Sequence, residues 1–272
     1  GQVGRVGQVG QVGQVGRVGR VGVRAAPAIM GRARRVRRVG RVRQVGRWWT
    51  EWTVHCSRRA PSWARAAPRT PAAPVPVRRA TCAASAAGIR EIVINHAWLG
   101  QQIEDTLGDG AAYGVQITYS AEGSQGLETA GGIATALPLL GSDPFLVING
   151  DILTDIDFSV AVRQSETLLS DGLAYLWLTA NPPHNPAGDF SLLSDGLIRS
   201  EGGGERLTFS GCGLYKSELF AETAPHRAAK LAPLLREAMT AGKVRGHYHN
   251  GLWLDVGTPE RLNEARCLAA SW

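Results

Sequence analysis

From residue 88 onward, short apolar runs alternate with longer segments in which apolar residues recur at helical spacing. The run at 145–148 is continuously apolar and contains β-branched residues, which is typical of a strand buried on both faces of a parallel sheet. Strand and helix patterns alternate at first, and this order predicts a right-handed, mostly parallel α/β layer. We expect strands at 91–96, 116–120, 145–148, 173–179, 189–193, 207–215, 244–249 and 253–256, and helices at 100–107, 128–140, 158–164, 231–241 and from Pro259.

The first part of the chain has no such pattern. Residues 1–23 repeat Gly-Gln/Arg-Val, and glycine at every third position without the proline of collagen fits neither a helix nor a strand. We therefore predict that residues 1–53 are a disordered, low-complexity leader. Residues 54–87 are rich in Arg, Ala and Pro without periodicity, and our hypothesis is that they are translated out of frame or degraded. The folded domain is then expected at 88–272, incomplete at its N-terminus.

The charge of the chain divides at the same place. The whole chain of 272 residues has a net charge of +7. Residues 1–88 hold 18 Arg, no Lys and one acid, whereas residues 89–272 hold 12 Lys or Arg and 22 Asp or Glu. The leader could bind polyanions through phosphate contacts, so an Arg-rich nucleic-acid-binding protein is one alternative. The acidic remainder is typical of an ordinary globular domain, and we expect no specific nucleic-acid partner for it.

Cysteine usage and hydropathy indicate the compartment. The four cysteines are widely spaced and form no C-x-x-C pair, which favours a reduced, cytoplasmic protein. The sequence has no run of about 18 apolar residues and no apolar signal-peptide segment, so neither a membrane span nor secretion is expected.

Two carboxylates follow predicted strands. Asp151 ends the segment Asn149-Gly-Asp151 after the 145–148 strand, and Asp255 lies at the end of another short strand, before a Gly turn. In open α/β sheets, ligands bind beyond the carboxyl ends of the strands. Two carboxylates combined with substrate phosphates suit Mg²⁺, which keeps its waters and rarely sits in an all-protein cage. We therefore predict that Asp151 and Asp255 hold Mg²⁺ and support phosphoryl-group chemistry.

A glycine-rich helix start is the third candidate feature. The small side chains within 127–132 would let backbone N–H groups approach a nucleotide closely. The histidines offer no rival site: His247 and His249 fit the polar face of an edge strand, and His96 and His184 are isolated in the sequence. No Ser or Cys nucleophile motif is present, so covalent catalysis has no support.

Taken together, these segments resemble the sugar-1-phosphate nucleotidyltransferases over residues 88–268. The resemblance is greatest to members that join UTP to N-acetylmuramate 1-phosphate in bacterial peptidoglycan recycling. It is carried by Glu91-Ile-Val-Ile-Asn-His-Ala-Trp-Leu-Gly100, Leu127-Glu-Thr-Ala-Gly-Gly-Ile133, Asn149-Gly-Asp151, Gly188-Asp-Phe190, Thr208-Phe-Ser-Gly211, Lys230-Leu-Ala-Pro-Leu-Leu-Arg236 and Trp253-Leu-Asp-Val-Gly-Thr-Pro-Glu-Arg261.

The resemblance implies a fold and a reaction. The fold is a Rossmann-like α/β domain of the nucleotide-diphospho-sugar transferase type, with a mixed, mostly parallel sheet and flanking helices. The reaction joins a nucleoside triphosphate to a sugar 1-phosphate, giving a nucleotide sugar and pyrophosphate. The resemblance implies Asp151 and Asp255 as catalytic, Mg²⁺-binding residues. It also implies nucleotide binding by Glu128, Thr129, Gly131, Gly132 and Asn149, and sugar-phosphate binding by Asp189, Gly211 and Lys230.

One part of the family pattern is missing. Family members begin with a buried strand and a Gly-rich loop whose Arg, with a later Pro-Lys-Pro, binds the triphosphate, but residues 1–88 contain neither sequence and no Lys. We therefore expect impaired activity and two uncovered strand edges where the first strand should be. A mannose-1-phosphate guanylyltransferase-like enzyme and a catalytically silent sugar-nucleotide binder stay open as alternatives.

Overall fold

The computed structural model of the chain describes residues 53–57, 75–124 and 126–270. The predicted disordered leader, apart from Thr53, lies outside the described residues. The described strands are β1 (Thr53–Ser57), β2 (Glu91–His96), β3 (Gln116–Ala121), β4 (Phe145–Asn149), β5 (Ile152–Thr154), β6 (Ala174–Thr179), β7 (Phe190–Leu192), β8 (Ile198–Arg199), β9 (Glu205–Tyr215), β10 (Val244–Tyr248) and β11 (Trp253–Asp255).

The described α-helices are α1 (Val75–Ala86), α2 (Gly100–Leu107), α3 (Glu128–Leu140), α4 (Phe158–Arg163), α5 (Ser165–Leu168), α6 (Leu231–Thr240) and α7 (Pro259–Ala270). Short 3₁₀ turns lie at Ala111–Tyr113 and Ser217–Phe220. The elements predicted beyond residue 88 are all present, with ends that differ by at most two residues. The sequence pattern gave no prediction for strands β1, β5 and β8 or for helices α1 and α5.

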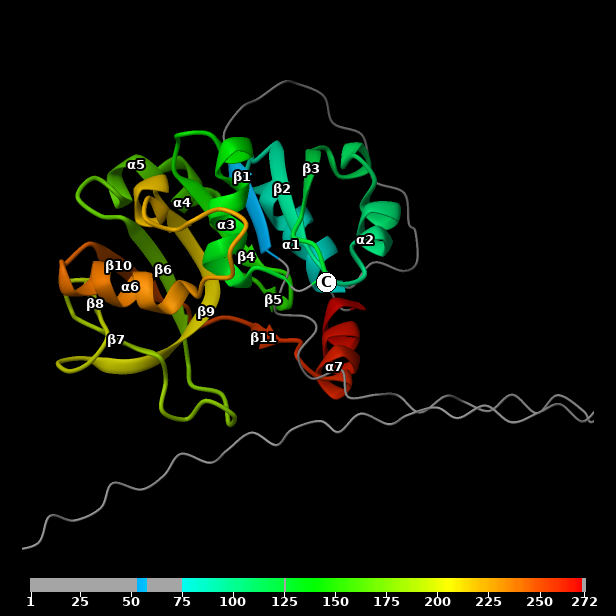
Figure 1. Cartoon of the computed structure of the whole chain (residues 1–272). Coiled ribbons are helices and arrows are strands. Elements are labelled where there is room, and N and C mark those ends of the chain that lie inside the picture. The colour runs from blue at the N-terminus through cyan, green and yellow to red at the C-terminus, as the bar shows by residue number, and fades with distance from the viewer. Residues whose placement is uncertain (1–52, 58–74, 125, 271–272) are drawn as a thin grey trace, which may run out of the picture. The chain divides into compact units, whose positions relative to one another are not determined.

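The main sheet has the strand order β10-β6-β9-β4-β1-β2-β3, and Figure 1 shows β1, in blue, between β2 and β4. Strands β2 and β3 pair in parallel, as do β6 and β10, whereas β1 and β9 are antiparallel to both of their neighbours. Within this described order, five strands therefore run in one direction and two run in the other. The prediction of a mixed α/β sheet is confirmed, although only two of the six pairings in this order, β2–β3 and β6–β10, are parallel.

Apolar residues of the central strands pack on both faces of this sheet. In β4, Leu146 and Ile148 belong to a core with α1, α4 and Trp177, whereas Phe145 and Val147 belong to a second core with α3 and α6. Successive side chains of a strand point to opposite faces, so an unbroken apolar run is the sequence signature of this arrangement. This explains why the 145–148 run could be interpreted correctly from sequence.

The predicted start of the domain at residue 88 is wrong, because α1 belongs to the hydrophobic core. Val77, Ala80 and Ala84 in this helix are buried against strands of the main sheet. With the buried Thr81 they form an i, i+3, i+4, i+7 stripe. The stripe consists mainly of small residues, which give a weak hydrophobic signal, and for this reason the helical period was missed.

The expectation of two uncovered strand edges is also wrong. Strand β1 pairs with β2 on one side, Thr53 opposite Asn95, and with β4 on the other, Thr53 opposite Asn149. The edges are covered because any extended backbone can supply the ladder hydrogen bonds, whatever its side chains. The direction of β1 is opposite to that of its two neighbours.

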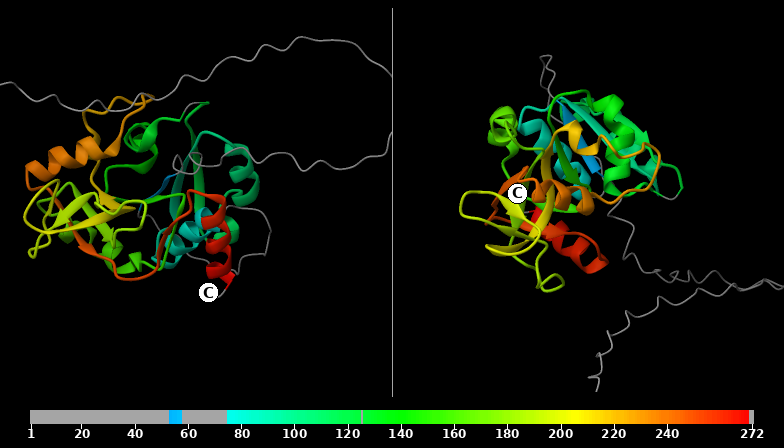
Figure 2. Two further views of the ribbon diagram at one scale, coloured as in Figure 1. Left: turned by 90° about the horizontal axis from the view of Figure 1, so that it is seen from below. Right: turned by 60° about the vertical axis from the view of Figure 1, so that its left-hand side comes forward.

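Helices α6 and α7 pack against different parts of the fold (Figure 2). Helix α6 packs near β8 and β10, whereas α7 packs against α1 and β11. A hydrogen bond of 2.6 Å from the Arg79 guanidinium to the backbone carbonyl of Ala269 joins α1 to α7.

Among the residues that the structure describes, no helix is both long enough and apolar enough to span a membrane.

Candidate active site

The two predicted metal-binding carboxylates lie at the small sheet formed by β5 and β11. Asp151 directly precedes β5, which pairs antiparallel with β11, and Ile152 lies opposite Asp255. The backbone N–H of Val256 donates a 2.8 Å hydrogen bond to the backbone carbonyl of Asp151. Residues more than a hundred positions apart in the sequence are thereby brought to adjacent positions, as the strand-end argument predicted.

Asp151 is a buried carboxylate whose hydrogen-bonding capacity is not fully used. Its exposed fraction is 4%, and its Oδ1 accepts no hydrogen bond from the described residues. The pKa of Asp151 is raised to about 7, mainly by burial and also by the charge of Asp255. A hydrogen bond from its own backbone and the charge of Arg261 act in the opposite direction. An ionised carboxylate in such a place is costly unless a cation approaches it.

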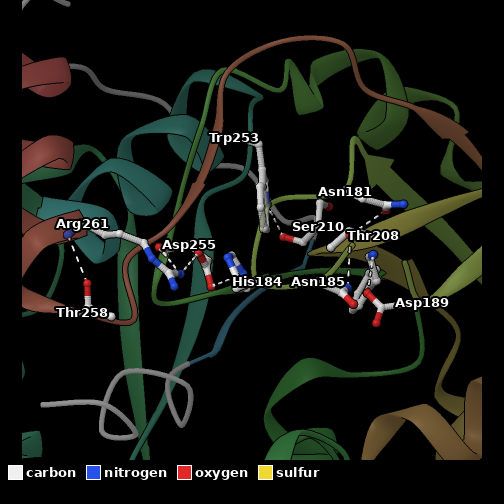
Figure 3. A network of polar contacts seen from close by, with 11 residues as sticks. Asn181, His184, Asn185, Asp189, Thr208, Ser210, Trp253, Asp255, Thr258 and Arg261 are labelled. Atoms are coloured by element: carbon white, nitrogen blue, oxygen red, sulfur yellow. Dashed lines mark hydrogen bonds and ion pairs between the residues drawn. The ribbon is translucent and has the colours of Figure 1, made fainter. Parts of the chain in front are cut away.

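Asp255 is paired through both of its oxygens (Figure 3). The Arg261 guanidinium contacts Oδ1, and His184 Nε2 lies 3.4 Å from Oδ2. Arg261 belongs to the first turn of α7, where its backbone N–H donates to the Thr258 hydroxyl at 3.3 Å. Thr258 therefore caps α7, as its sequence position predicts.

His184 is not isolated, contrary to the expectation from sequence. It lies in the polar loop between β6 and β7, and this loop is held on β9 by two asparagines (Figure 3). The Thr208 hydroxyl donates to Asn181 Oδ1 at 2.9 Å, and Asn185 Nδ2 donates to Thr208 Oγ1 at 3.2 Å. These bonds place the loop so that His184 reaches a strand 70 residues further along the chain, a contact that no local pattern could indicate.

Asn149 and Gly211 lie beside each other, near the carboxylate pair of Asp151 and Asp255. Gly211 has a φ of +77°, and a Cβ atom at this position would lie 2.9 Å from Asn149 Nδ2. Next to it, Trp253 Nε1 donates a 2.8 Å hydrogen bond to the Ser210 carbonyl, which connects β11 to β9 (Figure 3). Only glycine combines this backbone conformation with so close a neighbour. The predicted nucleotide-side Asn149 and sugar-side Gly211 are therefore in contact.

Asp189 is positioned by the backbone of β9. Its Oδ2 accepts a 2.8 Å hydrogen bond from the Phe209 N–H, and its own N–H donates to the Leu207 carbonyl at 2.8 Å. The side chain is half-buried, and one of its oxygens is used to hold β7 beside β9. Part of its role is therefore structural.

The start of α3 is closed by a neighbouring loop. The N–H groups of Ala130 and Gly131 donate to the Ala229 carbonyl at 2.9 and 3.1 Å. A Cβ at Gly131 would lie 2.1 Å from the Arg227 carbonyl oxygen, so glycine is needed for the approach of this loop. The expectation that these N–H groups face a nucleotide is wrong at Ala130 and Gly131, because helix-start amides need acceptors and Ala229 supplies one.

The same contact brings Lys230 to the start of α3. Lys230 follows Ala229, adopts an extended conformation directly before α6, and is exposed. On the other side, Glu128 is exposed with a φ of +58°, and Thr129 is half-buried. A non-glycine residue in the left-handed region is strained, and such residues cluster at functional sites. Glu128, Thr129 and Lys230 thus form a second group of polar side chains, apart from the carboxylate pair.

Glu122 positions this second group, although sequence analysis gave it no role. Its Oε1 accepts a 2.8 Å hydrogen bond from Asn95 Nδ2, and its Oε2 accepts one of 2.8 Å from the Leu127 N–H. A Cβ at Gly132 would lie 2.3 Å from Glu122 Oε1, so this glycine also permits a close approach. A lone glutamate after a strand carries no periodic signal, and only the fold reveals these contacts.

The other histidines make separate contacts. His247 Nδ1 lies 3.0 Å from the Tyr175 hydroxyl, and His249 Nε2 lies 2.8 Å from Asp155 Oδ1. Both histidines line a cavity of about 250 Å³ beside the edge strand β10, where sequence analysis placed them. His96, also predicted to be isolated, lies 2.7 Å from Glu104 Oε1.

A metal ion at the Asp151–Asp255 pair would need ligands beyond this protein's side chains. Within the described ranges, no group of three or more His, Cys, Asp or Glu residues could hold a metal ion. Two carboxylates completed by phosphate oxygens and water are nevertheless a common arrangement for Mg²⁺. The orphaned Oδ1 of the buried Asp151 fits such an ion.

Comparison with known proteins defines the class. The Nucleotidyl transferase family matches residues 75–192. The N-acetylmuramate alpha-1-phosphate uridylyltransferase of Neisseria meningitidis is 60% identical over 192 residues, which cover 70% of this chain and 83% of that protein. The protein of the same name from Caulobacter vibrioides is 32% identical, covering 64% of this chain and 76% of the relative.

A solved structure shows the same fold. A UDP-glucose pyrophosphorylase complexed with UDP-glucose is similar with a TM-score of 0.55 and 16% identity, covering 72% of this chain and 86% of that chain. The protein therefore belongs to the sugar-1-phosphate nucleotidyltransferases. These are enzymes that act on a nucleoside triphosphate and a sugar 1-phosphate, as the motifs indicated.

Proposed function

We propose that this protein transfers the uridylyl group of UTP to N-acetylmuramate 1-phosphate and releases pyrophosphate. The choice of base and sugar is supported by the two uridylyltransferases described above, at 60% and 32% identity. Such a reaction belongs to the reuse of cell-wall sugars in the cytoplasm. The observation that carries the proposal is the pairing of β5 with β11, which sets a buried Asp151 beside Asp255.

The carboxylate pair is the proposed catalytic end of the site. Asp151 and Asp255 would hold a Mg²⁺ ion, whose charge would neutralise that of the triphosphate during the transfer. Burial of Asp151 excludes water from one side of the pair and strengthens its interaction with any cation. Asn149 and Gly211, which lie in contact beside the pair, are proposed to face the nucleotide and the sugar phosphate respectively.

The α3 end of the site is proposed to hold the substrates in place. Glu128 and Thr129, with the backbone at Gly132, would contact the base and ribose. Lys230 is exposed and precedes α6 directly, so its ammonium group can act as a point charge on a phosphate. Asp189 would contact the sugar through the carboxylate oxygen that Phe209 does not use.

We further propose that turnover is reduced. Residues 1–88 contain no Lys and no Gly-x-Gly-x-x-Arg sequence, so these residues do not supply the basic groups that bind the triphosphate in the family. Loss of one preorganised charge-stabilising contact typically lowers kcat about 10²- to 10³-fold. Binding of a uridine nucleotide sugar, which depends on the α3 end and the carboxylate pair, is expected to persist.

The experiment is a paired assay on the full 272-residue chain. Pyrophosphate release is measured with UTP and N-acetylmuramate 1-phosphate, and separately with GTP and mannose 1-phosphate. Calorimetry measures the binding of UDP-N-acetylmuramate in the presence of Mg²⁺. We expect slow release with the uridine pair alone, together with measurable binding of the product. Faster release with the guanosine pair, or no binding of any uridine nucleotide, would refute the proposed substrates.

A further inference from the structure

Asp255 and Asp151 differ in how their oxygens are occupied. Oδ1 of Asp255 contacts the Arg261 guanidinium, and Oδ2 lies 3.4 Å from His184 Nε2. Asp151 Oδ1, in contrast, is buried and accepts no hydrogen bond from the described residues. Both oxygens of Asp255 therefore already have a nitrogen partner, with which a cation would share them, whereas Asp151 Oδ1 has none among the described residues.

Arg261 is held firmly in its position. The same guanidinium nitrogen that contacts Oδ1 also lies 3.3 Å from the Asp255 backbone carbonyl, and the side chain is about three quarters buried. Its backbone is fixed in the first turn of α7 by Thr258. A guanidinium is always charged, so Arg261 supplies a permanent positive charge at the carboxylate pair.

His184 reaches Asp255 from a different element. Its side chain is 42% exposed, and its loop is attached to β9 by Asn181 and Asn185. Figure 3 shows Arg261 and His184 approaching the Asp255 carboxylate from two sides. The two contacts therefore join α7 and the β6–β7 loop at one carboxylate.

We propose that Arg261 and His184 compete with the divalent cation for Asp255, so that cation binding requires Asp255 to exchange these contacts. The inference rests on the proposed function, because it takes Asp151 and Asp255 as the ligands. It assigns Arg261 as a built-in competitor whose charge weakens cation binding. His184, with a longer contact from an exposed loop, is the weaker competitor.

The charge balance gives the direction of each effect. When both carboxylates are ionised, they and the guanidinium carry one net negative charge, whereas removal of the guanidinium leaves two. A doubly negative pair attracts a divalent cation more strongly, and a partly buried site is screened little by salt. Arg261→Gln should therefore tighten cation binding, although it removes a contact from a ligand residue. A merely structural role for Arg261 predicts the opposite, since a displaced ligand binds more weakly.

The test measures Mn²⁺ binding to the full chain by electron paramagnetic resonance, without substrates. We expect Arg261→Gln to tighten Mn²⁺ binding about tenfold, which corresponds to about 1.4 kcal/mol. His184→Ala should tighten it about twofold to threefold, in keeping with a weak, exposed contact. Arg261→Lys keeps the charge and should stay close to the parent affinity.

Matched controls separate the possible outcomes. Arg266→Gln removes an exposed charge from the same helix, where Arg266 contacts Asn263, and should not change Mn²⁺ affinity. Far-ultraviolet circular dichroism verifies that each variant is folded. If Arg261→Gln does not fold, the His184→Ala result decides, and an unchanged or weaker affinity there overturns the inference.

The failure of this inference can be distinguished from failure of the proposed function. If Mn²⁺ binds and Asp255→Asn weakens it, while folded Arg261→Gln binds no more tightly than the parent, only the competition is overturned. If Mn²⁺ binding is indifferent to Asp151→Asn and Asp255→Asn, the metal site of the proposed function is refuted, and the competition is refuted with it.

Discussion

The two ends of the candidate site are built differently. At the carboxylate end, Asp151 is buried without full compensation and Asp255 is held by Arg261 and His184. At the α3 end, the glycines and the Ala229 carbonyl fix the backbone, while Glu128 and Lys230 are exposed. The first end therefore stores unfavourable electrostatic energy that a ligand can relieve, whereas the second end offers a rigid backbone frame with free side chains.

This difference predicts a large effect of Asp151→Asn on stability. In the folded protein the pKa of Asp151 is about 7, against 3.8 for an ordinary aspartate. Between pH 4 and 7 the folded state retains a proton that the unfolded state has released, so this group makes folding less favourable as the pH rises through that window. Asparagine removes the effect. We expect the free energy of unfolding of Asp151→Asn to exceed that of the parent by an amount that grows from near zero at pH 4 to about 4 kcal/mol at pH 8, at about 1.4 kcal/mol per pKa unit.

Urea unfolding of both proteins at pH 4 and pH 8 measures this gain. Asp105→Asn, which alters an exposed aspartate in α2, serves as the matched control and should show no such trend. A difference between Asp151→Asn and the parent that does not change with pH would contradict the electrostatic cost assigned to this carboxylate.

The second prediction concerns metal affinity at the same end. Asp255→Asn should weaken Mn²⁺ binding about a hundredfold, because the amide has no charge and one of the two carboxylate ligands is lost. Glu128→Gln, which alters an exposed acid at the α3 end, should leave Mn²⁺ affinity unchanged. Equal losses of Mn²⁺ affinity in the two variants would mean that cation binding is not confined to the carboxylate end, contrary to the proposal.

The third prediction tests the backbone frame of the α3 end. Gly131→Ala should destabilise the fold by about 2 kcal/mol, because the new methyl group would overlap the Arg227 carbonyl oxygen, 2.1 Å away. Gly257→Ala is the control, since the nearest atom to its added Cβ is 4.0 Å away. Thermal unfolding of both variants measures the difference. Equal melting temperatures would show that the 227–229 loop can move away without cost.

The smallest effect is expected from Glu128→Gly. Relief of the left-handed conformation of Glu128, with its φ of +58°, should stabilise the fold by about 1 kcal/mol. Loss of the side chain should at the same time weaken the binding of uridine nucleotides. Chemical unfolding and calorimetry together measure the two changes. A variant with lower stability and unchanged binding would remove Glu128 from the proposed nucleotide site.

Much of the fold could be predicted because the strands are buried on both faces. Continuous apolar runs such as 145–148 and amphipathic segments such as 231–241 report their elements directly. Helix α1 was missed because its buried stripe consists mainly of small residues. Strand β1 was missed because its five residues stand in a segment without periodicity, and pairing with two neighbours decides its structure.

The residues of the candidate site likewise fall into those with a local sequence signal and those that only tertiary contacts reveal. Asp151 and Asp255 could be found because a carboxylate after a short strand is a local signal, and the strand ends of one sheet converge. His184, Arg261 and Glu122 act through contacts with residues distant in the sequence or on another element. The closure of the α3 start by Ala229 is likewise a tertiary contact, and helix-start rules leave the partner of those amides undefined.

The central position of β1 has a consequence for the order of folding. Its partners are β2, some forty residues later, and β4, almost a hundred residues later, so neither half of the main sheet is joined to the other until residues near 149 have been synthesised. Such long-range pairings close large loops before they gain contacts, and folding slows accordingly. During synthesis the edge of β1 that later pairs with β4 therefore stays available to other chains, and we expect this to make the nascent protein prone to association.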